Sequence, residues 1–143
     1  MPRLPSSVPT EVELAILRVL WDRGRSTVRQ IHEGMKRGRE TGYSTTLKMV
    51  QVMTEKKLVV KDETQRPQVY RPAEAEEATQ LRLVDDLIQR GFAGSAMKLV
   101  MRAVAAERIS AEEMGQIRKL LDEAKRKQGP GGDLSGTGEG ERA

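Results

Sequence analysis

The fold of this chain is decided by residues 43–59, whose sequence is YSTTLKMVQVMTEKKLV. One face of this segment recurs at helical spacing and is expected to be buried: Thr46, Met49, Val50 and Met53. The opposite face carries Ser44, Thr45, Lys48, Gln51 and Val52. Hydroxyl groups are unusual on a face that is merely solvated, because surface helices normally recruit strong helix formers such as Glu and Lys. The pattern predicts an amphipathic helix over about residues 44–57, with Ser44 as its N-cap. The polar face of this helix is expected to bind a partner.

A β-hairpin is expected directly after this helix. Residues 58–62 and 68–72 are short runs rich in Val and Tyr, and the polar segment between them contains Pro67. Two such runs around a proline-containing turn are typical of a hairpin. Gln65 and Arg66 are then expected at its tip.

Two short helices are expected before residue 43. A T-x-x-E pattern starting at Thr10 has the spacing of a capping box and predicts a helix over about residues 11–22. A T-x-x-Q pattern starting at Thr27 predicts a second helix over about residues 27–37. Three short helices followed by a hairpin is the element order of a winged helix-turn-helix domain.

Three more helices are expected in the second half, over about residues 74–89, 95–106 and 110–127. Each has an apolar stripe with no obvious partner inside an already complete domain, although the stripes could also pack on that domain. We expect them to form the seam of a homodimer. The dimerisation residues are Leu81, Val84, Leu87, Ile88, Leu99, Val100, Val104, Ile117, Leu120 and Leu121.

The predicted fold class is therefore mainly α with a small β-hairpin. A winged helix-turn-helix DNA-binding domain over residues 8–72 precedes a three-helix dimerisation domain over residues 73–128. Residues 129–143 are rich in glycine and contain one leucine. Such a segment cannot bury enough apolar surface to offset its ordering entropy, so we predict a disordered tail.

Charge and composition narrow the class of partner. Residues 1–72 carry 14 Lys and Arg against 8 Asp and Glu, whereas residues 73–143 carry 11 against 13. A basic excess confined to one half indicates a polyanion-binding half, although many solvated domains reach a similar excess. Cysteine is absent, which excludes disulfides and thiolate metal sites and fits a cytoplasmic location. No apolar run reaches the length of a membrane span, and the N-terminus has no signal-peptide apolar region.

The sequence over residues 9–72 resembles the DNA-binding domain of the penicillinase-repressor (BlaI/MecI) family of winged helix-turn-helix regulators. The matching runs are TEVELAILRVLWD at 10–22, VRQI at 28–31, YSTTLKMVQVMTEKKLV at 43–59 and VYRP at 69–72. Together these runs are fairly specific, although each alone would be weak. The second half agrees with the family in layout, so the resemblance covers about residues 8–127.

The resemblance implies a dimeric, sequence-specific transcriptional repressor. It would bind a palindromic DNA operator through the helix at about 44–57 and the wing at about 58–72. The expected DNA-binding residues are Arg39, Tyr43, Ser44, Thr45, Thr46, Lys48, Gln51, Gln65 and Arg66. No cofactor, metal or catalytic residue is implied.

Two departures from the family pattern concern this helix. Family members often carry Arg near the position of Val52, so the phosphate or base contact of that Arg is not expected from Val52 here. They often carry Gly at the position of Lys57, which suggests a helix end without the usual left-handed glycine.

The resemblance leaves the inducing signal open. In the resistance branch of the family a sensor metalloprotease cuts an Asn-Phe bond in the dimerisation helices, and the comparable place here is Arg102-Ala103. A copper-responsive branch ends in a cysteine cluster, which this chain lacks. Whether an upstream sensor or protease acts on the protein is therefore not determined.

Two other function classes remain as alternatives. The winged helix could be a protein-interaction adaptor that has lost DNA affinity, against which the basic first half counts. It could also be an RNA-binding accessory protein, against which the lack of exposed aromatic stacking residues counts. An enzyme is not expected, because no nucleophile–base pair, phosphate loop or metal cluster is visible. His32 is the single histidine and is interpreted as a surface or packing residue.

Overall fold

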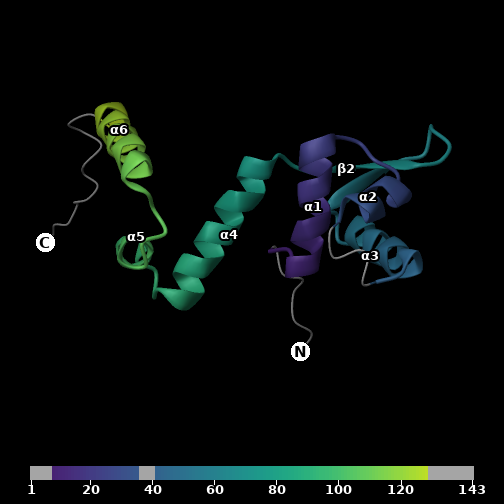
Figure 1. Cartoon of the computed structure of the whole chain (residues 1–143), viewed down its shortest axis with the longest axis horizontal. Coiled ribbons are helices and arrows are strands. Elements are labelled where there is room, and N and C mark those ends of the chain that lie inside the picture. The colour runs from purple at the N-terminus through teal and green to yellow at the C-terminus, as the bar shows by residue number, and fades with distance from the viewer. Residues whose placement is uncertain (1–7, 36–40, 129–143) are drawn as a thin grey trace, which may run out of the picture. The chain divides into compact units, whose positions relative to one another are not determined.

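The computed structural model of the chain describes residues 8–35 and 41–128. It divides after Ala93 into two compact units, the first with four helices and a hairpin and the second with two helices. Figure 1 shows these elements in chain order. This content confirms the predicted fold class: mainly α, with a two-stranded antiparallel hairpin in winged helix-turn-helix order. The tail predicted for residues 129–143 lies outside the described residues.

Capping boxes start the first two helices, as the sequence predicts. At α1 (Glu11–Arg23) the Thr10 hydroxyl accepts from the Glu13 N–H at 3.2 Å, and the Glu13 carboxylate accepts from the Thr10 N–H at 2.9 Å. At α2 (Val28–Gly34) Thr27 and Gln30 exchange the equivalent bonds at 3.1 and 2.9 Å. Each box satisfies two N–H groups that a helix start otherwise leaves unpaired.

The second helix is shorter than predicted, since α2 ends at Gly34 rather than near Arg37. Met35 already has extended backbone, with φ −91° and ψ 121°, and packs partly buried against the core. A Cβ on Gly34 would lie 2.9 Å from Cγ1 of Val19 on α1. The glycine therefore lets the two helices approach closely, and its weak helix propensity favours an end at this point.

The third helix, α3 (Tyr43–Glu55), begins earlier than the sequence suggests. Gly42 occupies the N-cap in extended backbone, and no side chain caps the helix. The predicted capping role of Ser44 was therefore wrong, because Ser44 lies inside the first turn. Its exposed hydroxyl is available for another partner.

Lys57 gives α3 a left-handed end. Its φ is 68°, its N–H donates to the Thr54 carbonyl at 3.1 Å, and the Leu58 N–H donates to the Met53 carbonyl at 2.9 Å. These two bonds define a Schellman motif, which usually places glycine where Lys57 stands. The helix thus ends in a left-handed turn although no glycine occupies it.

The hairpin pairs β1 (Val59–Asp62) with β2 (Val69–Pro72), and Lys61 lies opposite Tyr70. On its other side β2 is bridged to Ser26, the residue before the cap of α2. The Ser26 N–H donates to the Tyr70 carbonyl at 3.1 Å, and the Tyr70 N–H donates to the Ser26 carbonyl at 2.8 Å. The base of the wing is therefore tied both to its own partner strand and to the start of the helix-turn-helix.

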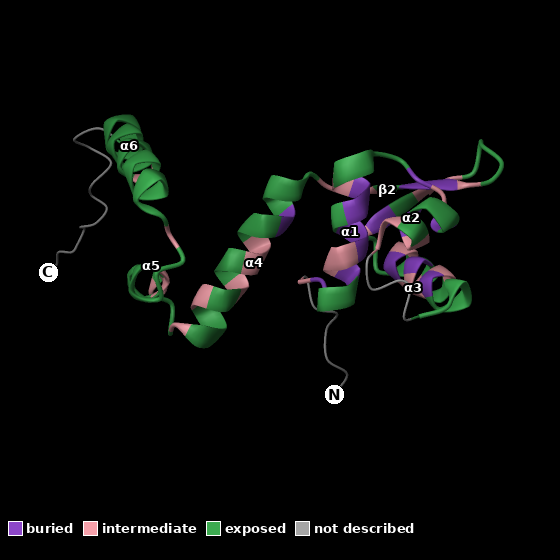
Figure 2. Ribbon diagram, in the orientation of Figure 1, coloured by how far each residue is buried: buried purple, intermediate pink, exposed green. Residues whose placement is uncertain are grey.

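One apolar core holds the winged helix together. Its buried members are Ile16, Leu17, Leu20, Val28, Ile31, Val50, Met53, Val59 and Tyr70. They come from α1, α2, α3 and both strands, which Figure 2 shows as the purple faces of these elements. Full burial of a large aliphatic side chain contributes about 1.5–3 kcal/mol, so this cluster fixes the orientation of α3.

The remaining helices bury little of their surface. α4 (Glu76–Gly91) has one buried residue, Thr79. In the second unit neither α5 (Ala96–Ala105) nor α6 (Ala111–Gln128) has any. The predicted capping box is present at α6, where Ser110 and Glu113 exchange hydrogen bonds of 3.0 and 3.1 Å. Within the described residues, no helix combines the length and the apolar character that crossing a membrane requires.

Candidate nucleic-acid interface

The two faces of α3 are used differently. Thr46, Val50 and Met53 are buried against the core. The exposed side presents five of the predicted DNA-binding residues: Tyr43, Ser44, Thr45, Lys48 and Gln51. This side carries a phenol, hydroxyls, an amide and an ammonium group, which are donors and acceptors suited to base edges and phosphates. Val52 is half-buried.

Thr46, one of the predicted DNA-binding residues, lies on the inner side of the helix. It is 2% exposed, and its hydroxyl lies 2.8 Å from Nδ1 of His32 on α2. A side chain that is buried and hydrogen-bonded within the protein has little to offer DNA. We therefore assign Thr46 to the packing of α3 on α2, and His32 to the same contact.

Tyr43 is held by two side chains of α2. The guanidinium carbon of Arg29 lies 5.0 Å from the centre of the Tyr43 ring, within the range of a cation–π contact. The His32 ring meets Tyr43 edge to face, with centroids 5.9 Å apart. Arg29 and His32 are one helical turn apart on α2, a spacing visible in the sequence, but Arg29 was not among the predicted site residues.

The turn end of the hairpin is ordered around Asp62, the last residue of β1. Its carboxylate accepts from the Thr64 hydroxyl at 2.6 Å and from the Thr64 N–H at 3.0 Å, and it pairs with Arg25 at 3.3 Å. The hydrogen bonds from Thr64 lower the pKa of Asp62, and the charges of Arg25 and Arg71 lower it further against the effect of burial. Asp62 therefore stays ionised, with its charge paired to Arg25, at the turn end of the hairpin.

The tip of the wing presents Gln65 and Arg66, both exposed as predicted. Beside the tip, Lys61 and Glu63 form an ion pair at 3.2 Å and neutralise each other. No carboxylate among the described residues lies within ion-pair distance of Arg66 or of Lys48. Arg39, the last of the predicted DNA-binding residues, lies outside the described part of the chain.

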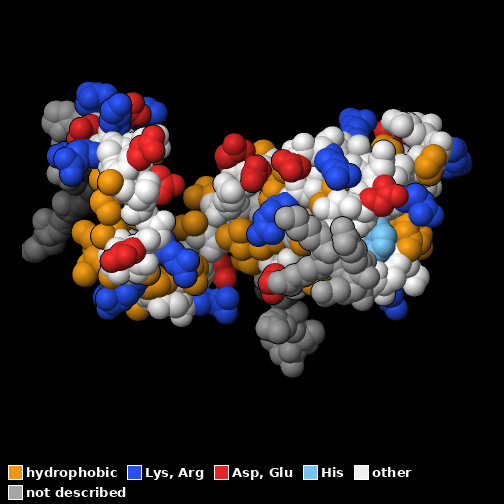
Figure 3. Space-filling view, in the orientation of Figure 1, with side chains coloured by type: hydrophobic (Ala, Val, Ile, Leu, Met, Phe, Trp, Pro, Cys, Tyr) orange, Lys and Arg blue, Asp and Glu red, His pale blue; other side chains and the backbone are white. Residues whose placement is uncertain are grey.

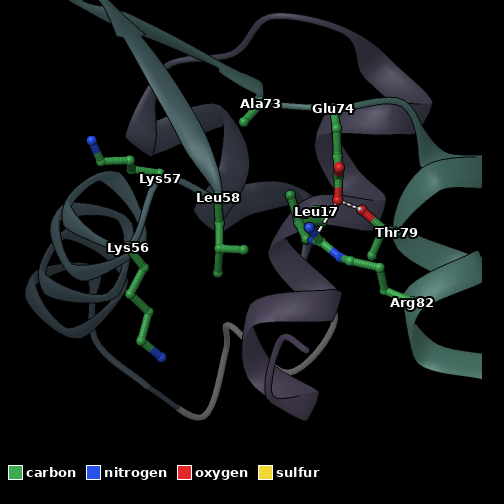
Figure 4. A pocket seen from close by; sticks show the side chains of 8 residues that line it. All are labelled: Leu17, Lys56, Lys57, Leu58, Ala73, Glu74, Thr79 and Arg82. Atoms are coloured by element: carbon green, nitrogen blue, oxygen red, sulfur yellow. Dashed lines mark hydrogen bonds and ion pairs between the residues drawn. The ribbon is translucent and has the colours of Figure 1, made fainter. Parts of the chain in front are cut away.

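A small pocket of about 270 Å³ lies where the end of α3 meets α4. Figure 4 shows Leu17, Leu58 and Thr79 around it, with the Glu74 carboxylate held by the Thr79 hydroxyl at 3.0 Å and paired with Arg82. Its volume falls below the roughly 300–1,000 Å³ of typical ligand pockets. The charge of Arg82 is neutralised by Glu74. We therefore interpret the pocket as part of the packing between α4 and the winged helix.

The predicted dimerisation residues are largely exposed in the single chain. Relative exposure reaches 69% at Leu81, 48% at Val100 and 62% at Leu120, while Ile88, Leu99 and Ile117 are half-buried. Orange side chains gather over α5 in Figure 3. The exposed large hydrophobic residues of this helix are Met97, Val100, Met101 and Val104. Contiguous exposed apolar surface is typical of interaction sites.

In the described ranges, no three His, Asp or Glu side chains are grouped closely enough to hold a metal ion. His32 instead makes the two packing contacts given above.

Comparison with known proteins agrees with this geometry. The penicillinase repressor family matches residues 9–123, from the start of α1 into α6. Transcriptional regulator BlaI of Mycobacterium tuberculosis (strain CDC 1551 / Oshkosh) is 31% identical over 115 residues, which cover 79% of this chain and 82% of that protein. The protein of the same name from strain ATCC 25618 / H37Rv matches with the same identity and coverage. The chain described here therefore belongs to the penicillinase repressor family.

Proposed function

We propose that this protein is a dimeric, sequence-specific DNA-binding transcriptional repressor that acts on a palindromic operator. The observation that carries the proposal is the exposed polar face of α3, set on a buried inner face. Family membership supports the DNA-binding and repressor parts. Because a repressor must be in the same compartment as its operator DNA, we propose a cytoplasmic location.

In this proposal α3 is the recognition helix and enters the major groove. A helix fits this groove, where each base pair presents a distinct pattern of donors and acceptors. Ser44, Thr45, Lys48 and Gln51 are the residues placed to contact base edges, with Tyr43 at the start of the helix. Arg66 and Gln65 on the wing would contact the sugar–phosphate backbone, which sets position rather than sequence preference.

The homodimer is proposed from the exposed apolar faces of α4, α5 and α6. The second unit has no buried residue of its own among those described, so a second copy of the chain supplies the surface that it lacks. A two-fold dimer presents two recognition helices, and each would contact one half of an inverted repeat.

The deciding experiment is selection of duplexes from a random pool with the full-length protein. An inverted repeat should emerge, with half-sites about 10 bp or a multiple of it apart. Anisotropy titrations of that duplex should show affinity falling steeply as salt rises from about 50 to 200 mM, because bound phosphates release counterions.

The protein-interaction adaptor makes the opposite forecast. Selection would then yield no consensus, and binding to any duplex would be weak and nearly independent of salt. Preference for single-stranded RNA over the selected duplex would instead favour the RNA-binding alternative. Neither experiment depends on knowing the regulated genes or the inducing signal.

A further inference from the structure

Arg29 is an exposed cation on α2 without an acidic partner. In the part of the chain that the structure describes, no carboxylate lies within ion-pair distance of its guanidinium, not even Glu33 one turn further along the same helix. The guanidinium instead lies over the Tyr43 ring, at 5.0 Å from the ring centre. A guanidinium in a cation–π contact directs its charge at the ring and still has several N–H donors to offer another group.

Tyr43 is itself well placed for this role. It is the first residue of α3 and is 38% exposed, next to the exposed hydroxyls of Ser44 and Thr45. His32 fixes the ring from α2, since its own ring meets Tyr43 edge to face and its Nδ1 lies 2.8 Å from the buried Thr46 hydroxyl. The Arg29–Tyr43 contact is thus held at a defined place beside the polar face of α3.

We propose that Arg29, in cation–π contact with Tyr43, forms a binding site for a backbone phosphate of DNA. In a helix-turn-helix the helix before the recognition helix crosses the DNA backbone, and Arg29 lies on that helix. Guanidinium groups bind phosphate through paired, charge-assisted hydrogen bonds. His32 is a positioning residue that acts through Tyr43 and Thr46. The inference rests on the proposed function, because it needs DNA in the groove beside α3.

The test compares Arg29→Gln with wild type on the selected duplex and on a scrambled one. A dimer would lose two phosphate contacts, so the slope of log affinity against log salt should become shallower by roughly 1.8, about 0.9 for each phosphate. Affinity should fall at least about tenfold on both duplexes, as expected for loss of charge-assisted hydrogen bonds. The preference for the selected duplex should stay unchanged, since a phosphate carries no sequence information.

Matched variants separate this role from a structural one. Arg126→Gln removes the same charge from α6, outside the winged helix, and should retain wild-type affinity and slope. Arg29→Lys should keep the slope but not the full affinity, because an ammonium group does not bind in the same fork geometry. Tyr43→Phe should retain the phosphate site, whereas Tyr43→Leu should weaken it.

The possible failures are distinguishable. An Arg29→Gln variant that is folded and dimeric yet keeps the wild-type salt slope overturns the phosphate site, whatever its affinity, while leaving the repressor proposal intact. Wild-type protein that binds no duplex in a salt-dependent way overturns the proposed function and this site with it.

Discussion

The ammonium nitrogen of Lys56 lies 2.7 Å from Oε2 of Glu13, and this ion pair joins the C-terminal end of α3 to the first turn of α1. The Glu13 side chain is 3% exposed, and its other oxygen, Oε1, accepts a hydrogen bond from the Thr10 N–H. A buried carboxylate is costly unless it is paired and hydrogen-bonded, and Glu13 is both. The contact ties the end of the proposed recognition helix to the scaffold.

This pair predicts acid sensitivity. Burial by itself raises the pKa of Glu13. The hydrogen bonds from Lys56 and Thr10 and the positive charge of Lys56 outweigh it, so the pKa lies below its ordinary value of 4.5. A carboxyl group with a lowered folded-state pKa contributes stability above its ordinary pKa, and that stability is lost as pH falls through the folded-state value. Urea unfolding of the Glu13→Gln variant should therefore depend less on pH below about 4.5 than unfolding of wild type. Identical pH profiles would contradict the pairing.

Lys56→Met tests the same pair from its other side. Lys56 is 40% exposed, so solvent screens it and the expected loss is modest, on the order of 1 kcal/mol. A double-mutant cycle with Glu13→Gln isolates the coupling between the two side chains. A coupling indistinguishable from zero would mean that Glu13 is stabilised by the capping box alone.

Replacing Lys57 with glycine should stabilise the protein. Lys57 has a φ of 68°, a conformation that crowds a Cβ and that glycine adopts freely. The Lys57→Gly variant should gain about 0.5–1 kcal/mol in chemical unfolding, after allowing for the greater freedom of glycine in the unfolded chain. Lys57→Ala keeps the Cβ and is the matched control, for which no gain is expected. Equal gains from both variants would trace the effect to the lost charge instead.

The contact between His32 and Thr46 should behave as a coupled pair. His32→Phe keeps the ring against Tyr43 but leaves the buried Thr46 hydroxyl without its partner, at a cost of about 1–2 kcal/mol. Adding Thr46→Val should recover much of that loss, because removing both polar partners together is nearly neutral. Thermal unfolding of the single and double variants gives the answer, and additive losses would argue against the hydrogen bond.

Lys48 and Arg66 should differ in what they contribute to DNA binding. Lys48→Ala is expected to cost about 1–3 kcal/mol on the selected operator and to relax preference at one base position, since Lys48 lies on the exposed face of α3. Arg66→Ala should weaken binding to all duplexes alike and make the salt slope shallower by about one unit per contact. Both variants should keep wild-type stability. If both bind as wild type does, this face of α3 does not enter the groove.

A charge introduced into the proposed apolar dimer interface should prevent dimerisation. Val100→Asp and Leu120→Asp lie on surface that is exposed in the single chain, so the monomer should remain folded. An unpaired carboxylate buried in a dimer interface is strongly unfavourable, and sedimentation should show monomers at micromolar concentration. Lys98→Asp, an exposed change on α5 outside the stripe, should leave the dimer intact. A wild-type monomer at the same concentration would contradict the seam itself.

Features that depend on neighbours within one or two helical turns were predictable from the sequence. Capping boxes at Thr10, Thr27 and Ser110 are present as predicted, because their bonds join residues three apart. Helical spacing placed Val50 and Met53 on the inner face of α3, since burial follows the period of the helix.

Contacts between side chains of different elements could be identified only from the folded structure. Arg29 makes a cation–π contact with Tyr43, and the Thr46 hydroxyl is hydrogen-bonded to His32. Glu13 pairs with Lys56, which lies 43 positions further along the chain. Local pattern cannot rank such partners, because each contact depends on how α1, α2 and α3 pack around one shared core. Packing likewise ended α2 at Gly34, where the helix meets α1, although the periodic sequence continues beyond it.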